Sequence, residues 1–180
     1  MQPLDETFMG QALSLAEGAL EAGNFPVGCV FVYDGNVVAR GYRTGSDGVV
    51  ANEIDHAEIN TLREFYCLPA EYIPEKITAY CTLEPCLMCF AALVITGVGR
   101  IVYAYEDAMG GGTSCRLQHL PPLYREHQPL VTPHVLRNES LSLFQAFFKR
   151  PGAKYLKETY LADYTLRQSL ESPSTSSTRR

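Results

Sequence analysis

The pattern of hydrophobic and polar positions predicts that helices and strands alternate along this chain. Between residues 5 and 22, apolar side chains recur every three or four positions and Gly23 follows, which is typical of an amphipathic helix and its end. Two apolar, β-type runs, 27–33 and 37–42, flank residues 34–36, which have the composition of a tight turn. These runs predict an antiparallel hairpin.

The middle of the chain continues with a helix–strand–helix–strand order. The expected elements are a polar loop over 43–54, a helix from His56 to about Phe65 capped by Asp55, a strand over 77–82, a helix over 86–96 opened by Pro85 and closed by Gly97, and a strand over 100–105. Because a helix connects these two strands, we expect them to pair in parallel.

The last third of the chain is less regular. We expect a loop over 107–128, a short edge strand over 130–136 interrupted by Pro133, a helix from Asn138 as its cap to about Arg150, and a final helix over 155–168. The whole order predicts an α/β fold, a three-layer α/β/α sandwich around a central mixed β-sheet, with one domain over residues 1–168. Residues 169–180, rich in serine and threonine, are expected to be a disordered tail.

Composition agrees with a single water-soluble domain. The chain has 180 residues, of which 46% are hydrophobic, and is long enough to form a core without disulfides. Its longest uninterrupted apolar run, residues 90–95, is far shorter than the roughly 20 residues that cross a bilayer. We therefore expect a soluble, cytoplasmic protein with no membrane partner.

Charge and cysteine content narrow the classes of function. The net charge of −5 argues against broad, sequence-independent wrapping of nucleic acid, although a local basic patch remains open. The six cysteines are irregularly spaced, which favours reduced thiols over a disulfide framework. Only Cys86 and Cys89 form a closely spaced pair.

Candidate metal ligands open two of the predicted helices. His56 stands at the start of one, and Cys86 and Cys89 lie one turn apart at the start of another. Imidazole nitrogen and thiolate sulfur are zinc ligands, and three protein ligands leave a fourth position for water, as in catalytic sites. A structural site with Cys115 as a fourth ligand is the alternative.

Glu58 supplies a base, a group that a structural zinc site would not need. Two residues after His56, its carboxylate is placed to take a proton from zinc-bound water and to return protons to a substrate nitrogen and a leaving amine. Water activation next to such a base is the chemistry of hydrolytic deamination.

His-x-Glu followed by Pro-Cys-x-x-Cys is the signature of zinc-dependent nucleobase deaminases. With the further matches that follow, the chain resembles the cytidine and deoxycytidylate deaminase superfamily, most closely its tRNA-specific adenosine deaminase branch, over about residues 5–150. The further matches are Pro26-Val27-Gly28, Leu83-Glu84 before the cysteine motif, Glu106-Asp107-Ala108 and Phe147-Phe148-Lys149-Arg150. The resemblance implies a homodimer that converts adenosine to inosine in a tRNA anticodon loop.

The resemblance also implies substrate contacts. Val27 would pack on the base, and Asp107 would touch the sugar or backbone. The N–H of Ala57 and the main-chain carbonyl of Pro85, beside the first cysteine, would address the base edge. Phe148 would stack on a nucleobase, whereas the ordinary expectation for an aromatic residue on such a helix is a place in the core.

One position departs from the family. Its second strand usually leads into an asparagine that binds the substrate, whereas this chain has Gly41-Tyr42-Arg43. Asn52 is a possible substitute, and Arg43 is expected either to contact a phosphate or to lie in solvent. Gly110-Gly111-Gly112 is expected to be a flexible active-site loop.

Two alternative functions stay open at this point. The same chemistry would serve a free base, nucleoside or nucleotide of the guanine, cytosine or cytidylate type, which the departure at Arg43 and the acidic charge favour. A non-catalytic zinc-binding subunit that scaffolds a partner is the third possibility, and Glu58 argues against it.

Overall fold

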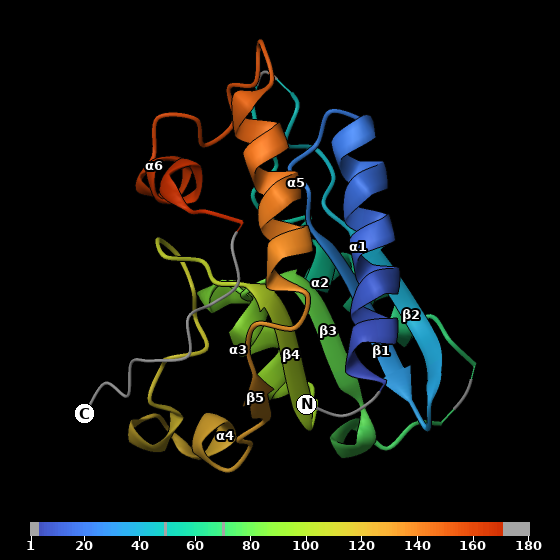
Figure 1. Cartoon of the computed structure of the whole chain (residues 1–180). Coiled ribbons are helices and arrows are strands. Elements are labelled where there is room, and N and C mark those ends of the chain that lie inside the picture. The colour runs from blue at the N-terminus through green and yellow to red at the C-terminus, as the bar shows by residue number, and fades with distance from the viewer. Residues whose placement is uncertain (1–3, 49, 70, 171–180) are drawn as a thin grey trace.

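The sheet is mixed and has five strands, as seen in a computed structural model that describes residues 4–48, 50–69 and 71–170 (Figure 1). The strand order is β2-β1-β3-β4-β5. β1 pairs antiparallel with β2 and β3, and β4 pairs parallel with β3 and β5, which confirms the predicted hairpin and parallel pair. The strands are β1 (Gly28–Tyr33), β2 (Asn36–Tyr42), β3 (Thr78–Leu83), β4 (Arg100–Tyr105) and β5 (Leu130–Thr132).

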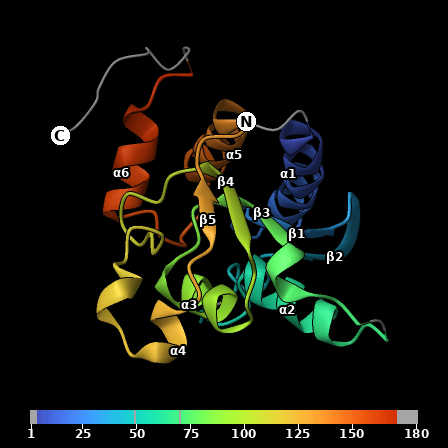
Figure 2. The same ribbon diagram turned by 90° about the horizontal axis from the view of Figure 1, so that it is seen from below.

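Helices cover both faces of this sheet. In Figure 2, α1 and α5 lie on one side, and α2 and α3 on the other, so the three-layer α/β/α architecture is confirmed. The longer helices are α1 (Asp5–Glu21), α2 (Ala57–Tyr66), α3 (Leu87–Ile95), α5 (Arg137–Lys149) and α6 (Tyr160–Arg167). The short ones are α4 (Pro122–Arg125), η1 (Pro74–Lys76) and η2 (Leu117–His119).

Alternation along the strands fills both layers of the core. In β1, Val30 and Val32 pack in the cluster under α1, whereas Cys29 and Phe31 belong to the cluster on the opposite side. Two glycines let helices approach closely. A Cβ at Gly28 would lie 2.1 Å from a backbone oxygen of α1, and one at Gly41 would lie 2.5 Å from the first residue of α2. The second contact fixes where α2 begins.

Two predicted helix caps are wrong. The N-cap of α2 is His56, and Asp55 instead pairs its carboxylate with Arg63 on the helix surface. The N-cap of α5 is Leu136, in the left-handed region at φ 53°, so Asn138 lies inside the first turn. In both places a tertiary contact or a turn decides the helix start, and the capping preference of the local residue does not.

The last third also differs in detail from the predicted pattern. The expected loop over 107–128 contains η2 and α4, and the final helix begins at Tyr160 with Thr159 as its cap. Residues 171–180 of the predicted tail lie outside the described residues. Within the part of the chain that the structure describes, no helix combines the length and apolar character needed to span a membrane.

Candidate active site

Three possible metal-donor atoms come together where α2 and α3 begin. His56 and Cys86 are the N-cap residues of α2 and α3, both with extended backbone, and Cys89 lies in the first turn of α3. The His56 Nδ1 atom lies 3.5 Å from the Sγ atoms of both cysteines. All three donor atoms lie within 4.8 Å of one another.

This spacing fits a tetrahedral zinc ion. Zn–S and Zn–N bonds of about 2.3 and 2.0–2.1 Å at tetrahedral angles place nitrogen and sulfur about 3.6 Å apart. The 3.5 Å separations match that value. Cys115 is exposed and is not a member of this donor group among the described residues, so the four-ligand structural site that would use it is not formed.

The surroundings of the three donors shift their pKa values in different directions. Hydrogen bonds from the Cys89 thiol and from His56 outweigh burial and lower the pKa of Cys86 to about 4. The same contact with Cys86, together with burial, raises the pKa of Cys89. His56 has a raised pKa because of its hydrogen bond with Cys86. Cys86 is therefore held as a thiolate, the form that binds zinc.

Glu58 lies beside these donors in the first turn of α2. Its side chain is buried, with a relative exposure of 3%, and burial raises the pKa of its carboxyl group. Its charge is felt by both His56 and Cys89. A carboxyl group with a raised pKa holds a proton more readily than an exposed one, which suits a group that must both accept and return protons.

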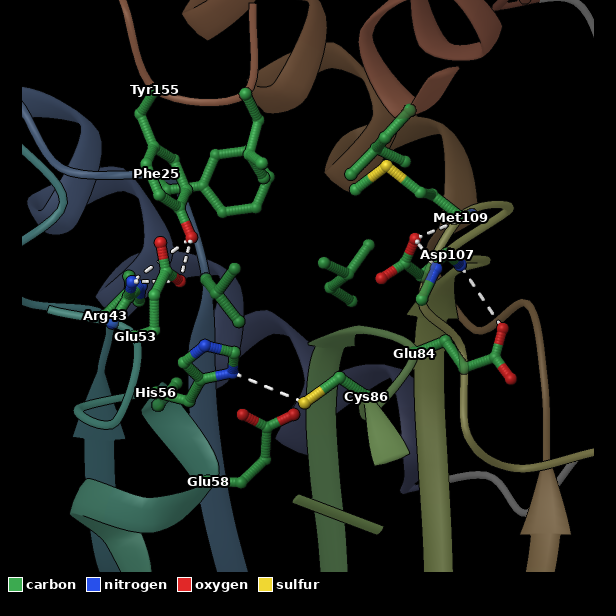
Figure 3. A pocket seen from close by; sticks show the side chains of 16 residues that line it. Phe25, Arg43, Glu53, His56, Glu58, Glu84, Cys86, Asp107, Met109 and Tyr155 are labelled. Atoms are coloured by element: carbon green, nitrogen blue, oxygen red, sulfur yellow. Dashed lines mark hydrogen bonds and ion pairs between the residues drawn. The ribbon is translucent and has the colours of Figure 1, made fainter. Parts of the chain in front are cut away.

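A pocket of about 200 Å³ opens above Glu58 (Figure 3). Of the predicted substrate contacts, Val27, Ala57 and Asp107 line it. Figure 3 shows His56, Glu58 and Cys86 together at its base, with Asp107 and Met109 on one side and Arg43 and Tyr155 on the other. The complete lining is Phe25, Val27, Arg43, Glu53, His56, Ala57, Glu58, Leu83, Glu84, Cys86, Asp107, Met109, Gly110, Tyr155, Leu156 and Leu161.

Phe148 and Pro85, two further predicted contacts, are not among the residues that line this pocket. Phe148 is 3% exposed and packs against Phe147 and Phe25, with ring centroids 5.6 and 5.9 Å away. It therefore supports Phe25, which does line the pocket, from behind. Pro85 is buried, and its carbonyl oxygen accepts a hydrogen bond of 2.8 Å from the Gly112 N–H.

Hydrogen bonds hold the glycine-rich loop in place. Asp107 Oδ1 accepts from the N–H groups of Met109 and Gly110 at 3.0 and 2.9 Å, and burial raises the pKa of this carboxyl group. The Glu84 carboxylate accepts from the N–H groups of Asp107 and Thr113. A Cβ at residue 111 would lie 2.4 Å from this carboxylate, so a larger residue there would have to displace the Glu84 side chain. The loop expected to be flexible is thus tied to the end of β3.

Sequence reasoning missed most of the wall opposite Asp107. Glu53 and Tyr155 line it, although 102 residues separate them, and no local pattern connects them. Arg43 lies between them with 2% exposure, so its expected place in solvent is wrong. Asn52 is not part of the lining, because its side chain bonds within the loop to Ile54 and Asp55.

Comparison with known proteins agrees with this geometry. The family model of the cytidine and deoxycytidylate deaminase zinc-binding region matches residues 2–105. A tRNA-specific adenosine deaminase of Bacillus subtilis (strain 168) is 32% identical over 145 residues, which cover 81% of this chain and 89% of the relative.

Solved structures give the same result. One, from a study of A-to-I editing by tRNA:A34 deaminases at the wobble position, has a TM-score of 0.64 and 34% identity, covering 76% of this chain and 98% of that one. A mutant of the protein NE0047 in complex with 8-azaguanine has a TM-score of 0.62 and 25% identity, covering 79% of this chain and 82% of that one. The family match spans all three donors and Glu58, and the chain therefore belongs to the cytidine and deoxycytidylate deaminases and carries their zinc-binding region.

Proposed function

We propose that this deaminase converts adenosine to inosine in a tRNA anticodon loop. The observation that carries the proposal is the buried carboxyl group of Glu58 next to three zinc donors at the base of a pocket of nucleobase size. The tRNA substrate is supported by the relatives, two of which are described as tRNA adenosine or tRNA:A34 deaminases. A cytoplasmic location agrees with such a substrate and is part of this proposal.

His56, Cys86 and Cys89 would hold the zinc ion, which supplies the Lewis acidity that makes a water nucleophilic at neutral pH. Glu58 takes the two protons of the attacking water in turn and delivers one to the ring nitrogen and one to the departing amine. A C–O bond forms at the amino-bearing ring carbon, its C–N bond breaks, and ammonia leaves.

The pocket walls orient the base for this attack. Val27 and Leu83 would give it apolar contact, and the N–H of Ala57, at the start of α2, would donate to its edge. Asp107 Oδ1 is occupied by the loop N–H groups, while Oδ2 has no hydrogen bond among the described residues. Oδ2 is therefore the oxygen that would accept from a sugar hydroxyl.

A second candidate is deamination of a free purine base. Two observations favour it: the structural neighbour NE0047 was solved with 8-azaguanine, and four carboxyl groups line the pocket of a chain whose net charge is −5. An acidic pocket is less suited to a polyanion than to a neutral base.

One experiment separates the two candidates. Purified, zinc-loaded protein is incubated with tRNA anticodon stem-loops and, in parallel, with free bases, nucleosides and nucleotides, and ammonia release and inosine are measured. Inosine in the RNA alone is the expected result. Turnover of a free base with the RNA unchanged would refute the tRNA proposal and leave the deaminase chemistry intact.

We further propose that two copies of the chain associate through α3. This helix carries no charged residue, and its outer side leaves Leu87 and Ile95 60% and 48% exposed. Helix surfaces of this kind are usually covered by another apolar surface. A second copy would bring two active sites close to one interface, because α3 also carries Cys86 and Cys89.

A further inference from the structure

Arg43 is a buried cation in the wall of the pocket. It follows the last residue of β2, and its backbone N–H donates to the carbonyl oxygen of Val27 at 2.8 Å. Its side chain is only 2% exposed, yet it lines the same pocket as Glu58. The backbone of Arg43 is thus held next to Val27, the residue against which the base is expected to pack.

The hydrogen bonds of Arg43 leave part of its guanidinium group available. Nη1 donates to the Thr44 carbonyl oxygen at 3.2 Å, and Nη2 donates to Glu53 Oε2 at 3.4 Å and to the Tyr155 hydroxyl at 3.2 Å. A guanidinium group has five N–H donors. The Nε–H and one Nη1–H of Arg43 therefore have no acceptor among the described residues.

The charge of Arg43 is also incompletely balanced. Its ion-pair partner is Glu53, whose side chain is 61% exposed and whose closest oxygen is 3.4 Å away. A solvated carboxylate at this distance is a weak partner for a buried cation, and its exchange for another anion costs little desolvation. Among the pocket-lining residues, Arg43 is the only lysine or arginine, beside the carboxyl groups of Glu53, Glu58, Glu84 and Asp107.

Tyr155 fixes the direction of the guanidinium group. Its hydroxyl donates to Glu53 Oε2 at 2.8 Å while accepting from Arg43. Its ring lies 5.5 Å from the guanidinium carbon and packs edge-on against Phe25. A residue of the segment that follows α5 thus orients a side chain that follows β2.

We propose that Arg43 binds a phosphate group attached to the target nucleoside and that Tyr155 is a positioning residue for it. The inference rests on the proposed function and names the part of the substrate that this wall recognises. The planar fork of a guanidinium group suits two phosphate oxygens, and a cation held inside an acidic pocket selects an anionic group at one place. The phosphate is either the RNA backbone beside the target or the phosphate of a free nucleotide.

The test is the salt dependence of KM. Deamination of an anticodon stem-loop, of adenosine monophosphate and of adenosine is followed at several KCl concentrations for the wild-type enzyme and for Arg43→Gln. Removing one phosphate contact to a single-stranded segment lowers the slope of log KM against log salt by about 0.7. We expect this loss of slope, a KM raised at least tenfold for the phosphorylated substrate and a nearly unchanged kcat. KM for adenosine should change little.

Arg40→Gln is the matched control. It removes the same charge three positions earlier, in β2, but Arg40 is exposed and does not line the pocket, so KM and its salt slope should stay at the wild-type values. Arg43→Lys keeps the charge and loses the fork, and we expect the slope to be retained with a raised KM. Tyr155→Phe should likewise raise KM several-fold without changing kcat or the slope.

The outcomes separate this inference from the proposed function. If the wild-type enzyme edits RNA and Arg43→Gln leaves the salt slope unchanged, the phosphate contact is wrong and the tRNA proposal stands. If the wild-type enzyme acts only on a neutral free base, both proposals fail. If Arg43→Gln does not fold, the comparison of Arg43→Lys and Tyr155→Phe with wild type decides, and an unchanged KM in both would overturn the inference.

Discussion

Among single residues, Glu58 has the most specific role in the proposed reaction. Burial raises the pKa of its carboxyl group, and no other pocket carboxyl lies in the first turn of α2 beside the zinc donors. We expect Glu58→Gln to bind zinc at the wild-type stoichiometry and to lose at least about 100-fold in kcat, because general acid–base catalysis contributes that much or more.

Zinc content by atomic absorption and turnover by ammonia release measure the two halves of this prediction. Glu64→Gln, an exposed carboxylate on the same helix, serves as the control and should keep both properties. Full activity in Glu58→Gln would remove Glu58 from the mechanism, and loss of zinc would make it a structural residue of the metal centre.

A second residue, Gly111, tests how the active-site loop is held. An alanine there would meet the Glu84 carboxylate at 2.4 Å and push apart the hydrogen bonds to Asp107 and Thr113. We expect Gly111→Ala to destabilise the fold by about 1–3 kcal/mol, as overpacked sites do. The melting temperature should fall by about 2–4 °C for each kcal/mol, and KM should rise.

Gly18→Ala is expected to change the stability of the fold in the opposite direction. Gly18 is exposed in α1 with no atom near its missing Cβ, so alanine should stabilise the helix by about 0.5–1 kcal/mol. Thermal unfolding of both variants measures the difference. A Gly111→Ala protein as stable and active as wild type would mean that the loop adapts and that the Glu84 contacts do not hold it.

The residues of the metal centre were predictable because their spacing is local. His56 and Glu58 are two positions apart, and Cys86 and Cys89 are one helical turn apart, so each pair has its relative placement set by one helix start. Arg43 and Tyr155 are 112 positions apart and meet only through tertiary packing. No periodicity within either segment indicates that contact.

Among the elements, α6 is joined to the end of β4 by a partly buried ionic cluster. The Glu106 carboxylate accepts from Arg137 Nε at 2.7 Å and from the Tyr164 hydroxyl at 2.8 Å, which joins β4, α5 and α6. Burial by itself would raise the pKa of Glu106, but the hydrogen bonds from Arg137 and Tyr164 outweigh it and lower the pKa overall.

This cluster predicts a pH-dependent stability. Because the folded-state pKa of Glu106 is lowered, its contribution is complete above about pH 4.5, its ordinary value, and is lost as the pH falls through the folded-state pKa. Glu106→Gln should unfold at a lower temperature than wild type at pH 7, with a cost of about 1–3 kcal/mol. The two proteins should converge in strongly acidic buffer.

Melting temperatures of both proteins between pH 3 and 8 check this prediction. Glu158→Gln, which removes an exposed carboxylate just before α6, should follow the wild-type curve throughout. A difference between wild type and Glu106→Gln that stays constant with pH would show that the carboxylate charge is not the source of the stability.

The helices and strands were largely predictable from the sequence, but the residues at which the helices begin were not. Apolar, β-type runs identify β1, β3 and β4, since both faces of these strands are buried under helices. The capping preferences of Asp55 and Asn138 predict the wrong starts for α2 and α5. The Asp55 carboxylate forms an ion pair with Arg63 instead of capping α2. α5 begins after Leu136, whose left-handed backbone conformation is not indicated by the neighbouring residues.

For the whole molecule, the apolar outer side of α3 predicts self-association. We expect a particle of twice the 20.0 kDa chain mass by light scattering. Ile95→Asp should reduce the mass to one chain, because a charge in a dimer contact is left buried without a partner. Leu4→Asp, which places the same charge on an exposed leucine just before α1, should leave the mass unchanged. A wild-type mass of 20.0 kDa would refute the dimer.

The pocket is assembled from several separate stretches of the chain, which lie within residues 25–58, 83–86, 107–110 and 155–161. The zinc donors and Glu58 all lie before residue 90, whereas Tyr155, Leu156 and Leu161 belong to the last 26 of the 180 residues. The residues that carry the reaction are thus separate in the sequence from these three residues of the pocket wall. Exchange of the C-terminal stretch between relatives offers evolution, or a directed-evolution library, a way to change which substrate is admitted while the reacting centre stays untouched.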